Sequence, residues 1–254
     1  MRIGIIILAT NSYFILGIRF IKRFLHYYKG DKKITFFFFS DENPVPYLKN
    51  DTNIQYYFET HENWACGTNS KFKNILRIKE QLKKEVDYIY YFDADTNVDN
   101  PFTEEWFIGD LVGGEHYGNR NFLSDGKGFD RNPKSTAYVP LDSKLPYTYH
   151  YGAFFGGKTD NVIRFCEILQ QNQMKDKEIN YEPGANDESY INQYFHINPP
   201  TYTVATEKFM FGISDKGGIG ETRNPSLSIE GHKKMILENK DKTFNLQNNI
   251  IIWL

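Results

Sequence analysis

Several short, continuous apolar runs constrain what this chain can fold into. One runs from Ile3 to Leu8, a second from Ile34 to Phe39 and a third from Val86 to Phe92. None of them alternates with polar residues, so each is expected to form a strand that is buried on both faces. A helical pattern from Tyr13 to Tyr28 separates the first two runs. This strand–helix–strand opening predicts an α/β fold, a Rossmann-like and mostly parallel sheet flanked by helices.

The helical segments are marked by apolar residues that recur every three or four positions. The first helix, for which Asn11 or Ser12 is the expected cap, should bury one stripe formed by Phe14, Ile18, Ile21 and Leu25. Its basic side chains should then face away from the core; they are Arg19, Lys22 and Arg23. The further expected elements are a strand at 53–58, a helix at 70–84, a helix capped by Thr159 or Asp160, and a helix that begins at Asn186 and stops at Pro199.

Length and composition narrow the class of protein. A chain of 254 residues without an internal repeat or an evident linker predicts a single domain over residues 1–254, with a mobile segment from about residue 208. A net charge of −2 gives no electrostatic support for a nucleic-acid partner. Only two cysteines, Cys66 and Cys166, are present, which predicts a reducing, cytoplasmic location without a disulfide framework. No apolar run is long enough to predict a membrane span.

Two carboxylates follow the third apolar run directly. Asp93 and Asp95 are separated by one residue, so in a strand they would point to the same side. Two like charges this close favour a divalent metal with oxygen ligands between them, one that also bridges phosphates. Ligands of open α/β sheets bind at the carboxyl ends of strands, so the turn at 9–13, after the first strand, is a second candidate for ligand binding. The pattern alone is weak, because a polar turn at the end of a strand has the same sequence.

Four segments together resemble glycosyltransferase family 6, which includes the blood-group A and B transferases and the α1,3-galactosyltransferases. The segments occur in the family's order between residue 3 and residue 195: Glu85-Val86-Asp87-Tyr88 leading into Asp93-Ala94-Asp95, then His116 with Pro133-x-Ser135-x-Ala137-Tyr138-Val139-Pro140, then Tyr151-Gly152-Ala153-Phe154-Phe155-Gly156-Gly157, and Asp187-Glu188-Ser189 with Asn192. The resemblance implies a GT-A fold. It also implies a retaining α1,3 transfer of galactose or N-acetylgalactosamine from a UDP-sugar donor to a galactoside-type glycan acceptor.

The resemblance assigns the donor side residue by residue. Asp93 and Asp95 would hold the ribose and a metal-bound diphosphate, and manganese is the expected metal, although several bacterial relatives have Asn-x-Asn here and work without a metal. The metal would neutralise charge on the departing UDP. Lys71 is a further candidate for contact with the donor. The residues implied around the uridine are Leu8, Ala9, Thr10 and Tyr13, and those implied to close over the diphosphate are Lys216 and Arg223.

Glu188 is the residue that the resemblance places at the chemistry, with Asp187 beside it in contact with the donor sugar. Retention requires a nucleophile or a carboxylate that stabilises an oxocarbenium-like ion pair, and the sequence leaves both mechanisms open. Tyr151 and Ala153 fall where the family selects the donor sugar by bulk, and they favour galactose over an acetamido sugar. His116 is similar to an acceptor-contacting histidine.

The chain departs from the family pattern at two positions on the acceptor side. Ala185 stands where the family has a tryptophan, and Gly128 stands where it has a threonine. Both departures put the usual acceptor of the family in doubt for this chain.

Two other readings compete with a transferase. Apolar residues before Asp-x-Asp also open haloacid-dehalogenase-type phosphatases, but these need Thr or Val at the position of Asn97, and their motif follows the first strand. A non-catalytic sugar-nucleotide or glycan-binding module on the same fold is the second alternative. Such a module has no use for a carboxylate at Glu188, so this residue discriminates between a binder and an enzyme.

Overall fold

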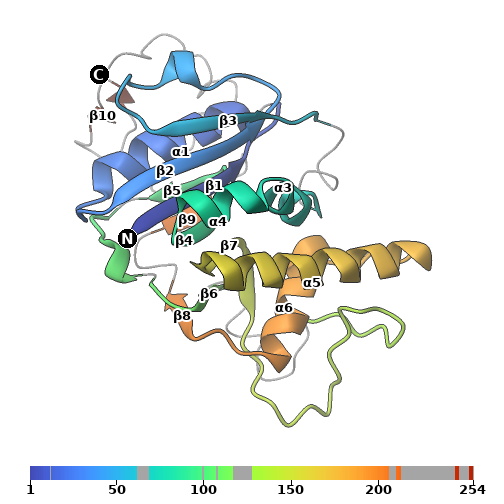
Figure 1. The fold of residues 1–254 in the computed structure, drawn as a ribbon. Helices are drawn as coiled ribbons and strands as arrows, with labels where there is room; N and C mark the ends of the chain where they lie inside the picture. The colour runs from blue at the N-terminus through green and yellow to red at the C-terminus, as the bar shows by residue number, and fades with distance from the viewer. Residues whose placement is uncertain are drawn as a thin grey trace. The chain divides into compact units, whose positions relative to one another are not determined.

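A computed structural model describes residues 1–11, 13–61, 69–98, 100–106, 108–116, 128–205, 210–212, 244–245 and 252–253 (Figure 1). Lys216 and Arg223 lie outside these residues. So does most of the segment from 208 for which mobility is predicted.

The main sheet has seven strands in the hydrogen-bonded order β3-β2-β1-β4-β7-β6-β8. β1 is parallel to β2, β2 to β3 and β6 to β8, whereas β6 and β7 are antiparallel. The predicted α/β class is therefore confirmed, and the mixed, mostly parallel sheet is consistent with a GT-A fold. The strands are β1 (Arg2–Leu8), β2 (Lys33–Ser40), β3 (Ile54–Phe58), β4 (Tyr88–Asp93), β6 (Leu111–Glu115), β7 (His150–Lys158) and β8 (Tyr202–Ala205).

The remaining described elements are five α-helices and several short pieces. The α-helices are α1 (Tyr13–Tyr27), α3 (Lys71–Arg77), α4 (Lys79–Glu85), α5 (Thr159–Glu178) and α6 (Asn186–Ile197). The short pieces are η1 (Val45–Tyr47), η2 (Glu104–Trp106), β5 (Thr96–Val98), β9 (Met210–Gly212), β10 (Phe244–Asn245) and β11 (Ile252–Trp253). β5 pairs antiparallel with β9, and β10 with β11.

Two local predictions about helices are wrong. The single helix expected over 70–84 is divided at Ile78, which leaves helical geometry (φ −114°, ψ 18°) and closes the first piece with a bond to the Ile75 carbonyl. Thr159 does not cap α5, because its hydroxyl donates instead to the carbonyl of Val86 (2.9 Å). The difference at Thr159 is due to a tertiary contact, because Val86 lies 73 positions earlier in the chain.

The chain divides into two compact units, each assembled from segments that are distant in the sequence. Unit 1 contains Met1, 62–90 and 105–206, and unit 2 contains 2–61, 91–104 and 207–254. β4 contributes residues to both units. The prediction of one domain over the whole chain stays a prediction.

In unit 2 the helix α1 packs through aromatic rings against strands of the sheet. Phe24 contacts Phe36 and Phe92 edge to face, with ring centroids 5.6 and 6.0 Å apart, and Phe20 lies 5.1 Å from Phe92. Figure 1 shows α1 alongside β1 to β3. The apolar stripe of this helix is therefore buried as expected, except at its end, where Leu25 is 43% exposed.

The prediction that the arginines of α1 face away from the core is wrong. Arg19 and Arg23 are only 2% and 5% exposed. Arg19 Nη2 donates to Asn97 Oδ1, and Arg23 Nε donates to the carbonyl of Val98, both at 2.8 Å. Asn97 and Val98 belong to β5, so this short strand covers the side of the helix that the sequence pattern assigns to solvent. Hydrogen bonding makes the burial of the guanidinium groups tolerable.

In unit 1 the core forms around β7 and the helices α5 and α6. Phe165 of α5 stacks on Phe195 of α6 (5.2 Å, 13°) and contacts Phe155 of β7 at 5.3 Å. Phe72 of α3 also contacts Phe155, at 5.9 Å. These contacts fix α6 against the strand from which the candidate site is built.

Within the described ranges, the structure contains no helix with the length and apolar character that crossing a membrane requires. A cytoplasmic location stays a prediction.

His150 should make the stability of the fold sensitive to acid. Its ring packs against Phe195 (4.7 Å), and burial lowers its pKa from 6.5 to about 4. Below pH 6.5 the unfolded chain therefore takes up a proton that the folded chain refuses. The stabilising contribution is complete above pH 6.5 and is lost as the pH falls to about 4, at a cost of roughly 3 kcal/mol.

Replacement of this histidine by phenylalanine should flatten the pH dependence. We expect His150→Phe to lose less unfolding free energy than the parent chain between pH 7 and pH 4.5, as measured by urea denaturation at a series of pH values. Equal losses in the two proteins would show that His150 is not the group that titrates.

Candidate active site

A large bulge in β7 shapes the candidate site. Gly113 of β6 pairs with Phe155, but the next residue, Gly114, pairs with Tyr151. Gly152, Ala153 and Phe154 therefore have no register partner on β6. Bulges re-aim backbone and side chains at functional sites. Here the bulge falls in the segment from Tyr151 to Gly157, whose glycines permit a close approach of the backbone to other groups.

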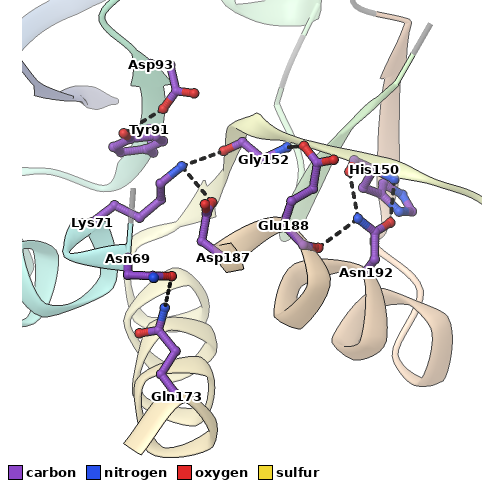
Figure 2. A network of polar contacts seen from close by, with 10 residues as sticks. All are labelled: Asn69, Lys71, Tyr91, Asp93, His150, Gly152, Gln173, Asp187, Glu188 and Asn192. Atoms are coloured by element: carbon purple, nitrogen blue, oxygen red, sulfur yellow. Dashed lines mark hydrogen bonds and ion pairs between the residues drawn. The ribbon is translucent and has the colours of Figure 1, made fainter. Parts of the chain in front are cut away.

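Both polar groups of the Gly152 main chain bond to side chains from other elements. Its N–H donates to Glu188 Oε2 (2.7 Å), and its carbonyl accepts from Lys71 Nζ (3.0 Å). Figure 2 shows both side chains pointing toward this glycine. A Cβ at this position would lie 3.0 Å from Asp187 Oδ2 and 3.1 Å from Glu188 Oε2. Because Gly152 has no side chain, the two carboxylates can approach its backbone without having to move.

Lys71 and Asp187 form a buried ion pair. Lys71 Nζ lies 2.7 Å from Asp187 Oδ2, and the side chains are only 1% and 7% exposed. Lys71 begins α3, whereas Asp187 lies in the first turn of α6. Burial of two charges is expensive unless they are paired and hydrogen-bonded, and the Gly152 carbonyl supplies the additional bond. This pair fixes the start of α6.

Glu188 follows Asp187 in the same first turn of α6, where the N-terminal end of a helix favours negative charge. Tyr149 is a second partner of its side chain, through the tyrosine hydroxyl. Burial, followed by the charge and hydrogen bond of Glu188, raises the pKa of Tyr149 and keeps the phenol protonated as a donor. The structure thus brings Lys71, Asp187 and Glu188 together around one peptide.

His116, the candidate for acceptor contact, lies in unit 1 with Tyr151 and Ala153, the candidates for selection of the donor sugar. His116 contacts the ring of Tyr151 edge to face (4.8 Å) and that of Tyr149 (5.8 Å). Burial lowers the pKa of His116, which favours the neutral ring. Ala153 is buried within the bulge, and Tyr151 is half-buried. At Gly128, a Cβ would lie 2.8 Å from the Tyr149 ring, so the departure from threonine at this position has a steric reason.

The segment that resembles the family's acceptor loop is anchored by a buried carboxylate that the sequence did not single out. Asp176 of α5 accepts hydrogen bonds from Ser135 Oγ (2.6 Å) and from the Thr136 amide (2.8 Å). Tyr190 of α6 also donates to it, at 3.2 Å. Through Asp176 the loop is therefore held to α5 and α6, and α6 carries Glu188.

The strand ends of unit 2 bring together polar groups near the turn after β1. The Thr10 hydroxyl is hydrogen-bonded to His61 Nδ1 (2.9 Å), and the Asn11 amide donates to both carboxylate oxygens of Asp41 (2.9 and 3.1 Å). These residues meet because β1, β2 and β3 run parallel and end at the same edge. Leu8 ends β1, Ala9 is fully buried, and Tyr13 begins α1. Asp41 and His61 were not singled out from the sequence, although each lies within three residues of the end of a predicted strand.

Asp93 and Asp95 lie at the carboxyl end of β4. Only Asp93 belongs to the strand, so the expectation that both point to one side as alternate residues of a strand does not apply. Asp93 is the last residue of the strand and accepts a hydrogen bond from the Tyr91 hydroxyl (2.7 Å), whereas Asp95 lies in the following turn. Both are half-buried carboxylates, the hard oxygen ligands that suit manganese or magnesium. Among the described residues, no cluster of three or more potential ligands exists. Two carboxylates would supply only part of the roughly six oxygen ligands that such an ion takes.

Comparison with known proteins gives the class of the chain. Residues 1–212 match the family model "Glycosyltransferase family 6". The chain therefore belongs to glycosyltransferase family 6. The position of Asp93 after β4, rather than after the first strand, also argues against a dehalogenase-type phosphatase.

Individual relatives are distant. The chain is 27% identical to globoside alpha-1,3-N-acetylgalactosaminyltransferase 1 of Gallus gallus over 82% of its length and 61% of the relative's. It is 27% identical to histo-blood group ABO system transferase 1 of Rattus norvegicus over 81% and 60% of the two lengths. It is 26% identical to the O-antigen biosynthesis glycosyltransferase WbnI of Escherichia coli over 65% and 69%. The chain thus spans about three fifths of the two animal relatives.

The buried ion pair provides a stability test. We expect Lys71→Met to lower the unfolding free energy by about 3–5 kcal/mol, because the substitution leaves the Asp187 carboxylate buried without its cation. Denaturant unfolding measures this change. The matched control is Lys79→Met, which removes the half-exposed partner of Glu167 (2.9 Å) and should cost about 1 kcal/mol or less. Equal effects of the two substitutions would contradict the assigned importance of the buried pair.

Proposed function

We propose that this protein is a retaining hexosyltransferase that moves galactose or N-acetylgalactosamine from a UDP-sugar to a galactoside-type glycan acceptor through an α1,3 bond. Membership of family 6 supports the reaction class. The relatives named as α1,3-N-acetylgalactosaminyltransferases support the linkage and one of the two sugars. The observation that carries the proposal is the Glu188 carboxylate, held by the Gly152 amide beside the Lys71–Asp187 pair.

Glu188 is the proposed catalytic carboxylate. A retaining transfer needs a negative group close to the anomeric carbon, either as a nucleophile or as the partner of an oxocarbenium-like ion. The hydrogen bond from the Gly152 amide orients this group before the substrate binds, and pre-orientation lowers the cost of reaching the transition state. Asp187 contacts the donor sugar in this proposal, and Lys71 keeps Asp187 in place. Both retaining mechanisms remain open.

The other candidates take roles on the nucleotide, sugar and acceptor. Asp93 and Asp95 hold a divalent metal, manganese in this proposal, which when bound neutralises charge on the departing diphosphate. Tyr151 and Ala153 restrict the space beside the sugar's 2-substituent and favour galactose, and His116 contacts the acceptor. The residues proposed for the uridine are Leu8, Ala9, Thr10 and Tyr13, and those proposed for the diphosphate are Lys216 and Arg223.

Hydrolysis of the donor tests the reaction without knowledge of the acceptor. UDP-galactose, UDP-N-acetylgalactosamine, UDP-N-acetylglucosamine and UDP-glucose are incubated with the protein and manganese, and released UDP is measured. We expect one of the first two donors to be hydrolysed fastest. We also expect Glu188→Gln to reduce this rate roughly 100-fold or more, because the carboxylate charge is lost.

The matched control is Glu178→Gln, which changes an exposed glutamate at the end of α5 and should leave the rate unchanged. Failure to turn over any of the four donors would contradict the transferase assignment. Full turnover by the Glu188→Gln variant, with donor binding intact, would instead favour a non-catalytic binding module.

The metal assignment has its own test. With the best donor, EDTA should abolish hydrolysis and manganese should restore it. Asp93→Asn and Asp95→Asn should each raise the manganese concentration needed for half-maximal rate by about tenfold or more, since each removes a carboxylate ligand. Asp142→Asn, at an exposed loop position, is the control and should not change this concentration. Unchanged hydrolysis in EDTA would contradict the metal assignment.

A further inference from the structure

Asn192 of α6 makes a two-point contact with the main chain of β7. Its Oδ1 accepts a hydrogen bond from the His150 amide (2.6 Å), and its Nδ2 donates to the His150 carbonyl (2.9 Å). The side chain is completely buried. It therefore pairs with one residue of the strand as a neighbouring backbone amide would (Figure 2). The main chain of His150 fixes the orientation of the Asn192 amide. In the reverse orientation the Asn192 NH₂ group would face the His150 N–H, and its oxygen would face the His150 carbonyl.

The same side chain also bonds to the turn of α6 that carries the proposed catalytic residue. Nδ2 donates to the carbonyl oxygen of Glu188 at 2.8 Å, four residues earlier in the helix. Both N–H groups and the oxygen of the buried Asn192 amide are therefore hydrogen-bonded. One side chain joins the main chain of Glu188 to the main chain of β7.

These contacts close a ring through Glu188. From Asn192 the ring passes to His150, along the strand to Gly152, and from the Gly152 amide to the Glu188 carboxylate (2.7 Å). It returns from the Glu188 carbonyl to Asn192. Glu188 is consequently held at both ends, its carbonyl by Asn192 and its carboxylate by Gly152. A shift of α6 along β7 would have to break the Asn192 bonds before it could move the carboxylate.

We propose that Asn192 is a positioning residue for Glu188, one that sets the place of the carboxylate relative to the bulged strand at Gly152. The inference rests on the proposed catalytic role of Glu188. It adds a residue that touches neither donor nor acceptor and acts through the helix turn. Asp187 lies in the same turn but has its own anchor in the ion pair with Lys71 (2.7 Å), so loss of the clamp should reduce the rate of reaction more than donor affinity.

Asn192→Asp is the sharpest substitution, because the two side chains have nearly the same shape. The aspartate keeps an acceptor for the His150 amide but loses both donated bonds and places an oxygen against the carbonyls of His150 and Glu188. We expect kcat for hydrolysis of the preferred UDP-sugar to fall about 10- to 100-fold, since small misplacements of a catalytic group have effects of this size. The KM for the donor should stay within about threefold.

Two further variants control for general damage to the helix. Asn198→Asp changes an exposed asparagine at the end of α6 that also bonds to a carbonyl four residues earlier, Tyr194 at 3.4 Å, and it should leave kcat unchanged. Asn192→Ser removes the clamp without introducing a charge and should reproduce the kcat loss with an unchanged KM. If Asn192→Asp does not fold, the kcat of Asn192→Ser tests the proposal in its place.

A double-mutant cycle separates positioning from a merely structural role. If Asn192 acts through Glu188, Asn192→Ser should cause little further loss of kcat in a Glu188→Gln background, while its effect on unfolding free energy should be the same in both backgrounds. An unchanged kcat, a change confined to KM, or a full additional loss on top of Glu188→Gln would overturn the inference. Glu188→Gln by itself decides the underlying proposal, because a normal rate in that variant removes the catalytic role of Glu188.

Discussion

The peptide groups at Gly152 are the constraint on which the candidate site depends. In a regular antiparallel pair the N–H and carbonyl of this glycine would be available to the neighbouring strand, but the bulge in β7 removes its partner on β6. The two groups bond instead to Glu188 and Lys71, which come from α6 and α3. The absence of a side chain lets both carboxylates of α6 approach the strand. The bulge therefore leaves the N–H and carbonyl of Gly152 to bond to Glu188 and Lys71, and these bonds hold both charged side chains in place.

Buried charged side chains recur in the described residues, and several of them are held by specific hydrogen bonds. Lys71 is neutralised by Asp187 and bonded to a carbonyl, whereas Arg19 and Arg23 donate to β5. Asp176 takes three donors from the loop at 135–136 and from α6. Such groups add little net stability compared with apolar packing, yet the loss of one partner leaves an expensive unpaired charge. They consequently penalise alternative arrangements of the helices and loops they join.

The two units contain different kinds of functional group. Unit 2 gathers small polar groups at the ends of three parallel strands, where Thr10 meets His61 and the Asn11 amide meets Asp41. Unit 1 gathers the ion pair, the candidate catalytic carboxylate and the aromatic rings around His116. In the proposed function the strand-end groups of unit 2 contact the nucleotide, and the carboxylates and aromatic rings of unit 1 contact the sugars.

The sequence by itself determined the α/β class, four of the seven strands of the main sheet (β1, β2, β3 and β4) and the family, because buried strands and motif residues are local patterns. It also marked Glu188, Asp187, Lys71 and the segment containing Gly152. Only the tertiary structure decided how these residues connect. The Gly152–Glu188 and Lys71–Gly152 bonds join residues 36 and 81 positions apart, and the Asn192 clamp on His150 spans 42. The burial of Arg19 and the bulge in β7 likewise depend on partners that are distant in the sequence, because hydrogen-bond partners are set by proximity in space.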